Sequence, residues 1–208
     1  MTTWAIIPVK PLHESKRRLA HLLSVEARAG LMRRFLDDLL SVLSETPGID
    51  RVLVVTGDVE VTALAEARGA TLLREPSPAG LNAAVARGVE FAVRQGATAA
   101  LILPADLPFA RVADIEAMLR PLTTVDRPLI ALTGDEGEEG TNALLLAPPG
   151  DFTFHYGPGS FAAHRAEAAA RHRTVHIINA SGLRFDLDTE SDWRTYSDEL
   201  VELAEEQG

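Results

Sequence analysis

Short apolar segments alternate with helix-like segments along this chain of 208 residues, and that alternation restricts its fold more than any other feature. The apolar segments are partly β-branched and end at Gly, Pro or charged residues, as is typical of strands buried on both faces of a sheet. Seven segments have this character: Trp4–Val9, Arg51–Thr56, Ala70–Arg74, Ala99–Leu103, Leu129–Leu132, Ala143–Ala147 and Thr174–Ile178. Helical spacing of apolar residues is found between them, over Val25–Ser44, Val59–Arg68, Gly80–Arg94, Val112–Leu119 and Phe161–Arg171.

The order of these segments predicts an α/β sandwich built on a mostly parallel sheet. Late in the chain the strand-like segments follow one another less regularly, so we expect the sheet to be mixed there. The length fits a single domain that covers residues 1–208. Ligands of an open α/β sheet bind beyond the carboxyl ends of its strands, so the loops that follow the strands are the places to look for a site.

The composition excludes several classes of function. The net charge of −10 argues against a nucleic-acid or anionic-membrane partner, because such proteins normally carry a basic face. With no Cys, the chain has no disulfide, thiolate zinc site, iron–sulfur cluster or cysteine nucleophile. No apolar run approaches the ~20 residues of a membrane span, and the opening MTTWAIIPVKP is unlike a signal peptide. We therefore expect a cytoplasmic protein.

The loop after the first predicted strand is basic in an otherwise acidic chain. Residues 10–18 contain Lys10, Lys16, Arg17 and Arg18 against the single anion Glu14, a local net charge of +3. Such a loop is where the phosphates of a ligand would meet positive charge. It is not a P-loop, because it lacks the glycines and the Gly-Lys-Ser/Thr ending. The alternative is a solvated basic turn before a helix.

Asp106 follows the strand-like segment Ala99–Leu103 and stands between Pro104 and Pro108, which restrict the backbone around it. A carboxylate held in this way suits a Mg²⁺ ligand, since Mg²⁺ takes one or two protein carboxylates together with substrate phosphates. The alternative is that Asp106 caps the helical segment after Pro108.

Two further carboxylates alternate with apolar residues in Phe185-Asp186-Leu187-Asp188. On an extended chain, Asp186 and Asp188 point to one side while their neighbours face the core. The two carboxylates can share a cation or take separate roles. Alternatively, Thr189 and Asp192 form a capping box at the start of the last helix, and the two interpretations are compatible.

The segment Gly157-Pro158-Gly159-Ser160 runs into a predicted helix, where free backbone N–H groups, a Ser cap and the positive helix end would form an anion cradle. His164 lies one turn further on and is expected to be a polar surface residue rather than a catalyst. Asn82, after Gly80, is a candidate for contact with a base or ribose, or for a helix cap. The acidic segment Asp135–Glu139 is expected to be a solvated loop.

Together these loops fit an enzyme that joins two phosphorylated molecules with the help of Mg²⁺. They do not fit a serine hydrolase, because the chain has no Gly-x-Ser-x-Gly motif.

The motifs also resemble those of the 2-phospho-L-lactate guanylyltransferase family, which includes bacterial enzymes that act on phosphoenolpyruvate. The resemblance covers nearly the whole chain and rests on seven motifs: I-P-V-K-P-L, S-K-R-R-L-A, A-D-L-P, G-L-N-A-A, G-T-N-A-L, F-H-Y-G-P-G-S-F-x-x-H and D-L-D-T-E-S-D. The most specific of them are G-T-N-A-L and F-H-Y-G-P-G-S-F-x-x-H. It implies a nucleotide-diphospho-sugar-transferase-like fold, a Rossmann-like α/β/α sandwich with a mostly parallel, partly mixed sheet.

The resemblance further implies that GTP reacts with a phosphorylated three-carbon acid, releasing pyrophosphate, in the biosynthesis of the deazaflavin coenzyme F-420. A downstream transferase that accepts the unstable product would be a further partner. By motif, the residues around GTP would be Lys10, Lys16, Arg18, Gly80 and Asn82. Of these, Lys16 and Arg18 would hold the phosphates and act in catalysis with Asp106. Asp106 and Asp188 would hold Mg²⁺, with Asp186 as a second candidate, and the acceptor would bind at Thr141, Gly157 and Ser160.

Two alternatives remain at this point. One is a molybdenum-cofactor-type guanylyltransferase or a GT-A-like transferase, although the L-A-G-G start of the former is absent. The other is a non-catalytic GTP-binding module that docks on a partner enzyme. The resemblance leaves 2-phospho-L-lactate, phosphoenolpyruvate and 3-phospho-D-glycerate open as the acceptor. The Arg-rich, Lys-poor composition indicates a GC-rich bacterium. Because bacterial members of the family that the chain resembles mostly use phosphoenolpyruvate, the resemblance favours this acid.

Overall fold

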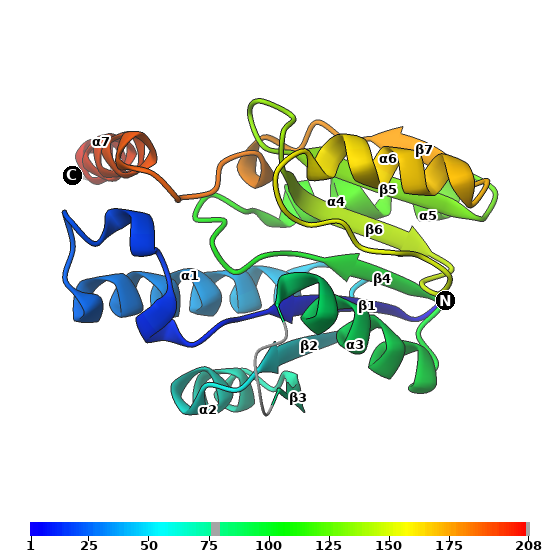
Figure 1. Cartoon of the computed structure of the whole chain (residues 1–208), viewed down its shortest axis with the longest axis horizontal. Coiled ribbons are helices and arrows are strands. Elements are labelled where there is room, and N and C mark those ends of the chain that lie inside the picture. The colour runs from blue at the N-terminus through cyan, green and yellow to red at the C-terminus, as the bar shows by residue number, and fades with distance from the viewer. Residues whose placement is uncertain (76–79, 207–208) are drawn as a thin grey trace.

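A single seven-stranded sheet forms the centre of the computed structural model, which describes residues 1–75 and 80–206, with side chains up to residue 199 (Figure 1). In space the strands follow the order β3-β2-β1-β4-β6-β5-β7. Their bounds are β1 Thr3–Pro8, β2 Arg51–Thr56, β3 Thr71–Arg74, β4 Ala99–Ile102, β5 Leu129–Gly134, β6 Thr141–Ala147 and β7 Thr174–Ile177. All seven predicted strands are therefore confirmed.

The sheet is mixed because one strand, β6, runs against its neighbours. β1 is parallel to β2 and β4, β2 to β3, and β5 to β7, whereas β6 is antiparallel to both β4 and β5. Residues 135–140 join β5 to β6 directly, and so short a connection can only link neighbouring antiparallel strands. The expectation of a mostly parallel sheet that becomes mixed late in the chain is confirmed.

The helices cover both faces of the sheet (Figure 1). Alternate residues of each central strand point to opposite faces, so that Ile7 joins the core under α1, α2 and α4 while Ile6 joins the core under α3 and α6. The bounds are α1 Val25–Glu45, α2 Val59–Ala67, α3 Leu81–Arg94, α4 Val112–Leu119, α5 Pro121–Thr124, α6 Ser160–Ala170 and α7 Glu190–Glu206. This is the expected α/β/α sandwich.

The five helical segments predicted from periodicity are confirmed to within one residue at each end. Short elements were not predicted, because a single turn has no visible periodicity: α5 and the 3₁₀ turns η1 Leu12–Glu14, η2 Arg17–Leu19 and η3 Ser181–Leu183. Within the described part of the chain, no helix combines the length and the apolar character that crossing a membrane requires.

Burial on both faces was predicted for every strand, and for two strands that prediction is wrong. β3 and β7 have only partly buried or exposed residues, whereas β4, β5 and β6 are buried throughout. The physical reason is position, since β3 and β7 form the two edges of the sheet and are covered by fewer side chains.

The reversal of β6 decides what gathers at one edge of the sheet. β1 and β4 end there with their carboxyl ends, and β6 starts there because it runs in the opposite direction. Thr141 and Asn142, the first residues of β6, therefore lie at the same edge as the loops that follow β1 and β4.

Candidate active site

Two adjoining cavities open at this edge of the sheet. The larger, of 720 Å³, extends over the start of β6 and the loops before α6 and α7, and the smaller, of 380 Å³, lies against α1 and the start of α3. Six residues line both cavities: Pro8, Lys10, Leu81, Pro104, Asp106 and Asp188. A long ligand can therefore lie across both, with its middle at Asp106 and Asp188.

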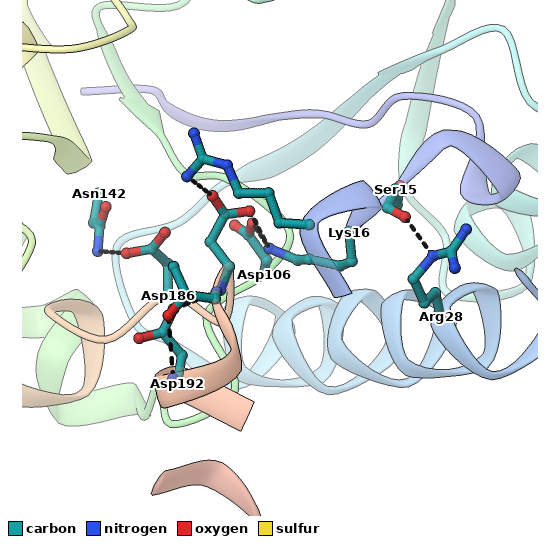
Figure 2. Close-up of polar contacts among 10 residues, drawn as sticks. Ser15, Lys16, Arg28, Asp106, Asn142, Asp186 and Asp192 are labelled. Carbon is teal, nitrogen blue, oxygen red and sulfur yellow. Dashed lines mark hydrogen bonds and ion pairs between the residues drawn. The ribbon is translucent and has the colours of Figure 1, made fainter. Parts of the chain in front are cut away.

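An ionic cluster, formed by Lys16, Arg18, Asp106 and Asp188, lies where the two cavities meet. The Lys16 ammonium forms an ion pair with Asp106 and lies 3.8 Å from Oδ1 of Asp188 (Figure 2). Nη1 of Arg18 donates to Oδ2 of Asp188 over 2.8 Å. Three loops from distant parts of the chain thus meet through their charges.

Lys16 is placed by its backbone. Its φ of +52° is left-handed, and the chain turns there between η1 and η2. The buried Arg28 of α1 holds the preceding residue, donating from Nε to the carbonyl oxygen of Ser15 over 3.2 Å (Figure 2). Because Lys16 is itself buried, the alternative of a wholly solvated basic turn is wrong. Of the two arginines, Arg18 lines the large cavity, whereas the exposed Arg17 lines neither.

Asp106 does not cap the following helix, since the N-cap of α4 is Arg111. That alternative is wrong, and the Asp106 carboxylate faces Lys16 and the cavities instead. Asp106 lies at this edge of the sheet because β4 ends at Ile102, and the loop that contains Asp106 follows directly.

Asp186 is a partly buried carboxylate that lines the large cavity. Its Oδ1 accepts from Nδ2 of Asn142 over 3.2 Å (Figure 2). Burial raises the pKa of Asp186, and the neighbouring charge of Asp106 raises it further, while Asn142 and Lys16 act in the opposite direction. Asp106, Asp186 and Asp188 thus lie along the same cavity, which other acidic residues also line, and a cation would offset their charge.

The predicted alternation around these carboxylates is confirmed. Leu187 is fully buried, and Phe185 packs against Phe109 with ring centroids 5.1 Å apart, while Asp186 and Asp188 line the cavity. The capping box is also present. Oδ2 of Asp192 accepts from the backbone N–H of Thr189 over 2.6 Å, and the Asp192 N–H donates to Oγ1 of Thr189 over 3.3 Å.

A second group, the hydroxyl cluster of Thr141, Ser160 and His164, lies under the other end of the large cavity. Ser160 Oγ is 3.2 Å from Thr141 Oγ1, which is 3.0 Å from His164 Nδ1. The backbone N–H of His155 donates to His164 Nε2 over 2.9 Å. His164 is fully buried, so its prediction as a surface residue is wrong.

The protons of this cluster follow from its contacts. Burial lowers the pKa of His164 to about 4, with a further contribution from His155 and an opposing one from Glu167, so the ring is neutral near pH 7. A backbone N–H can only donate, so Nε2 is the acceptor and Nδ1 carries the proton that Thr141 accepts. One of the two hydroxyl protons of Thr141 and Ser160 bonds the pair together. The other is left to donate to a ligand.

Ser160 is not the predicted helix cap. The N-cap of α6 is Gly159, and Ser160 is the first helical residue, buried against Thr141. Two amides expected to be free are also used, since Ser160 N–H donates to the Gly157 carbonyl and Phe161 N–H to that of Glu139. The predicted anion cradle therefore offers side-chain hydroxyls more than free amides of the helix end.

The remaining predicted site residues lie at different parts of the two cavities, and one lies outside both. Lys10 lines both cavities, Gly80 lines the small one as N-cap of α3, and Gly157 lines the large one. Asn82 lines neither cavity, because its amide group donates to the Tyr156 carbonyl over 3.1 Å and accepts from the Tyr156 N–H over 2.7 Å. It is not a cap either, and its contact with GTP stays a prediction.

Sequence reasoning missed three contributors to the large cavity. Asn142 could have been noticed as a polar residue in an apolar strand. Residues 135–139 are largely exposed, as predicted, but several also line the cavity, because the Asp135 carboxylate accepts from the backbone N–H groups of Glu139 and Gly140 over 2.9 and 2.7 Å. Arg184 steadies this loop by donating to the Glu136 carbonyl over 2.9 Å.

The site can be compared with known proteins. Residues 3–196 match the family described as "Guanylyl transferase CofC like". A phosphoenolpyruvate guanylyltransferase of Rubrobacter xylanophilus is 40% identical over 92% of this chain and 92% of its own length. A 3-phospho-D-glycerate guanylyltransferase of Phenylobacterium zucineum is 38% identical, with 90% of this chain and 86% of its own length covered.

A more distant relative extends the range of named acceptors. The 2-phospho-L-lactate guanylyltransferase of Methanothermobacter thermautotrophicus is 31% identical over 92% of this chain and 82% of its own length.

The fold is similar to that of a solved structure from Desulfovibrio desulfuricans, described as a nucleotide-diphospho-sugar transferase, with a TM-score of 0.74. The two chains are 15% identical, and the match covers 94% of this chain and 87% of that one. The chain belongs to the family of CofC-like guanylyl transferases.

Proposed function

We propose that this enzyme transfers the guanylyl group of GTP to the phosphate of a three-carbon phospho-acid and releases pyrophosphate, with phosphoenolpyruvate as the acceptor. The observation that carries the proposal is the arrangement of the ionic cluster and the hydroxyl cluster around one cavity, in a chain 40% identical to a phosphoenolpyruvate guanylyltransferase. The ionic cluster suits phosphates, and the hydroxyl cluster suits the anionic end of an acid.

The residues have to bring two anions together rather than supply a nucleophile. Lys10, Lys16 and Arg18, which line the two cavities, would neutralise and align the phosphates of GTP. An oxygen of the acceptor phosphate would then attack the α-phosphorus in line, and pyrophosphate would leave. The acceptor phosphate is already largely deprotonated near neutral pH, so no general base is required. His164 is not one, because its Nδ1 donates and its Nε2 is occupied.

The carboxylates Asp106, Asp188 and Asp186 fit a Mg²⁺ ion. They line one cavity, and the pKa of Asp186 is raised mainly by burial, with a further contribution from the charge of Asp106. Within residues 1–75 and 80–199, no three His, Asp or Glu side chains form a ready-made metal cluster. One or two of these carboxylates would therefore hold the ion together with the substrate phosphates. When bound, Mg²⁺ would neutralise charge on the departing pyrophosphate.

At the other end of the cavity, the hydroxyl cluster would bind the acceptor. The one available hydroxyl proton of Thr141 and Ser160 would be donated to a carboxylate or phosphate oxygen, and the Gly157 backbone lies beside it. We further propose a cytoplasmic role in the biosynthesis of coenzyme F-420, with a downstream transferase that accepts the product. The family match and the names of the relatives support the guanylyltransferase reaction on which this role rests.

Pyrophosphate release tests the reaction. The enzyme is incubated with Mg²⁺ and GTP and offered phosphoenolpyruvate, 2-phospho-L-lactate or 3-phospho-D-glycerate in turn, with ATP in place of GTP as the control. We expect GTP-dependent release with phosphoenolpyruvate. Release with another acid alone would correct the acceptor. Silence with all three acids, despite measurable GTP binding, would overturn the proposal in favour of a docking module.

A further inference from the structure

The small cavity has a lining unlike that of the large one. Val9, Met32, Leu81 and Ala84 supply apolar surface, and all but Leu81 are buried. Its volume of 380 Å³ and its apolar walls suit a flat aromatic group. Since it joins the large cavity at Lys10, Asp106 and Asp188, a nucleotide with its phosphates at the ionic cluster would place its base here.

Glu75 lines this cavity from the end of β3 and does not line the large one. The residue is only 9% exposed, and within the described residues no group forms a hydrogen bond with its buried Oε1. The nearest cation is Nη1 of Arg87 at 3.6 Å, while Nη2 of the same guanidinium donates to the Arg74 carbonyl over 3.2 Å.

A buried carboxylate oxygen without a hydrogen bond costs folding free energy, and among the described residues Oε1 has only the ion pair with Arg87 at 3.6 Å, so the Glu75 carboxylate has room for a donor supplied by a ligand. An ionised carboxylate is acceptor-only and has two oxygens side by side. Guanine presents a matching pair of neighbouring donors, N1–H and the 2-amino group, on its Watson–Crick edge. Adenine presents one donor, its 6-amino group, beside an acceptor at N1, so it could satisfy only one carboxylate oxygen and would bring N1 against the other.

We propose that Glu75 reads the base of the nucleotide, its carboxylate accepting hydrogen bonds from N1–H and the 2-amino group of guanine. This inference rests on the proposed function only in placing the phosphates at the ionic cluster. It makes Glu75 the residue that selects GTP over ATP in the reaction.

Binding of three nucleotides to the whole protein tests the proposal. GTP, ITP (which lacks the 2-amino group) and ATP are titrated by calorimetry into the wild type, Glu75→Ala and Glu75→Gln. We expect the wild type to prefer GTP over ITP about 10-fold and over ATP by more, because each lost charge-assisted hydrogen bond weakens binding. In Glu75→Ala, GTP affinity should fall roughly 100-fold and the GTP-to-ITP ratio should approach one.

Glu75→Gln keeps the side-chain volume and guards against a folding defect. Its amide oxygen accepts from N1–H, but its NH₂ group meets the 2-amino group, so ITP should now bind better than GTP. Glu60→Ala is the matched control, because Glu60 is an exposed carboxylate that pairs with Arg33 outside both cavities. It should bind all three nucleotides as the wild type does.

An unchanged GTP-to-ITP ratio in both folded Glu75 variants would overturn the proposal. This result is distinct from failure of the proposed function. If no acid supports pyrophosphate release but the nucleotide preference still depends on Glu75, the base-reading role stands while the reaction falls. If release occurs and the ratio is insensitive to Glu75, the reaction stands and the base is read elsewhere.

Discussion

The ionic cluster and the hydroxyl cluster lie around one cavity but are built on opposite principles. Lys16, Arg18, Asp106 and Asp188 hold one another through charges, and Arg18 and Asp188 are open to solvent. Thr141, Ser160 and His164 are buried, neutral and joined by directional hydrogen bonds. Charged pairs near water can exchange partners when phosphates and a cation arrive, whereas a buried network keeps its geometry.

The difference between a charged, partly exposed cluster and a neutral, buried one suits two separate tasks, transfer of the guanylyl group and recognition of the acid. Transfer of a guanylyl group changes the charge on phosphates and needs groups that respond to it, which is the role we assign to the ionic cluster. Recognition of a small acid needs a fixed donor, which is the role we assign to the hydroxyl cluster. Variants in the two clusters should therefore fail in different ways.

The largest effect is expected at Asp106. Asp106→Ala should lower kcat by about 1,000-fold, equivalent to about 4 kcal/mol, because the carboxylate pairs with Lys16 and faces the cavity in which we propose that the phosphates bind. The exposed Asp126→Asn serves as control and should leave activity unchanged. Turnover and thermal unfolding are measured together. A loss of stability that parallels the loss of activity would show that Asp106 is structural.

The next effect is on stability and concerns His164. Its pKa in the folded protein is lowered to about 4, below the ordinary 6.5, so the unfolded chain binds more protons between these values. Stability due to this group is therefore complete above about pH 6.5 and is lost as the pH falls toward 4, by about 3 kcal/mol in total.

Denaturant unfolding at pH 7 and pH 4.5 measures this loss. In His164→Asn the fall in stability should be smaller than in the wild type, because other titrating groups are common to both proteins. The Asn side chain can still donate to Thr141, so acceptor binding should survive better in His164→Asn than in His164→Leu. Equal pH dependence in wild type and His164→Asn would argue against a buried, neutral ring.

A smaller effect is expected at Ser160. Ser160→Ala removes a hydroxyl that contacts Thr141 and should raise the KM of the acceptor about 10- to 30-fold, roughly 1.5–2 kcal/mol, with little change in the KM of GTP. Steady-state kinetics with each substrate varied separately tests this split. If both KM values rise together, Ser160 does not belong to the acceptor site alone.

The smallest effect distinguishes two neighbouring arginines. Arg18→Ala should raise the KM of GTP about 5- to 10-fold, since Arg18 lines the large cavity, and Arg17→Ala should have almost none. The same steady-state assay compares them. A larger effect at Arg17 would reverse the assignment of the phosphate-binding guanidinium.

Much of the site could be predicted because its residues follow strands directly. Asp106 comes after β4, and the basic loop containing Lys16 comes after β1, so both were expected at the ligand edge. Contacts between distant loops could not be predicted. Glu75 looks like an ordinary charged residue after β3, and only the fold shows it buried against a cavity.

The sequence by itself determined the seven strands, the principal helices and the chemical character of the loops, because periodicity and local charge are properties of short segments. Only the tertiary structure decided that β6 runs in reverse, that Ser160 and His164 are buried together, and that Lys16 lies between Asp106 and Asp188. Burial and contact between distant residues depend on how the whole chain packs, and no short segment contains that information.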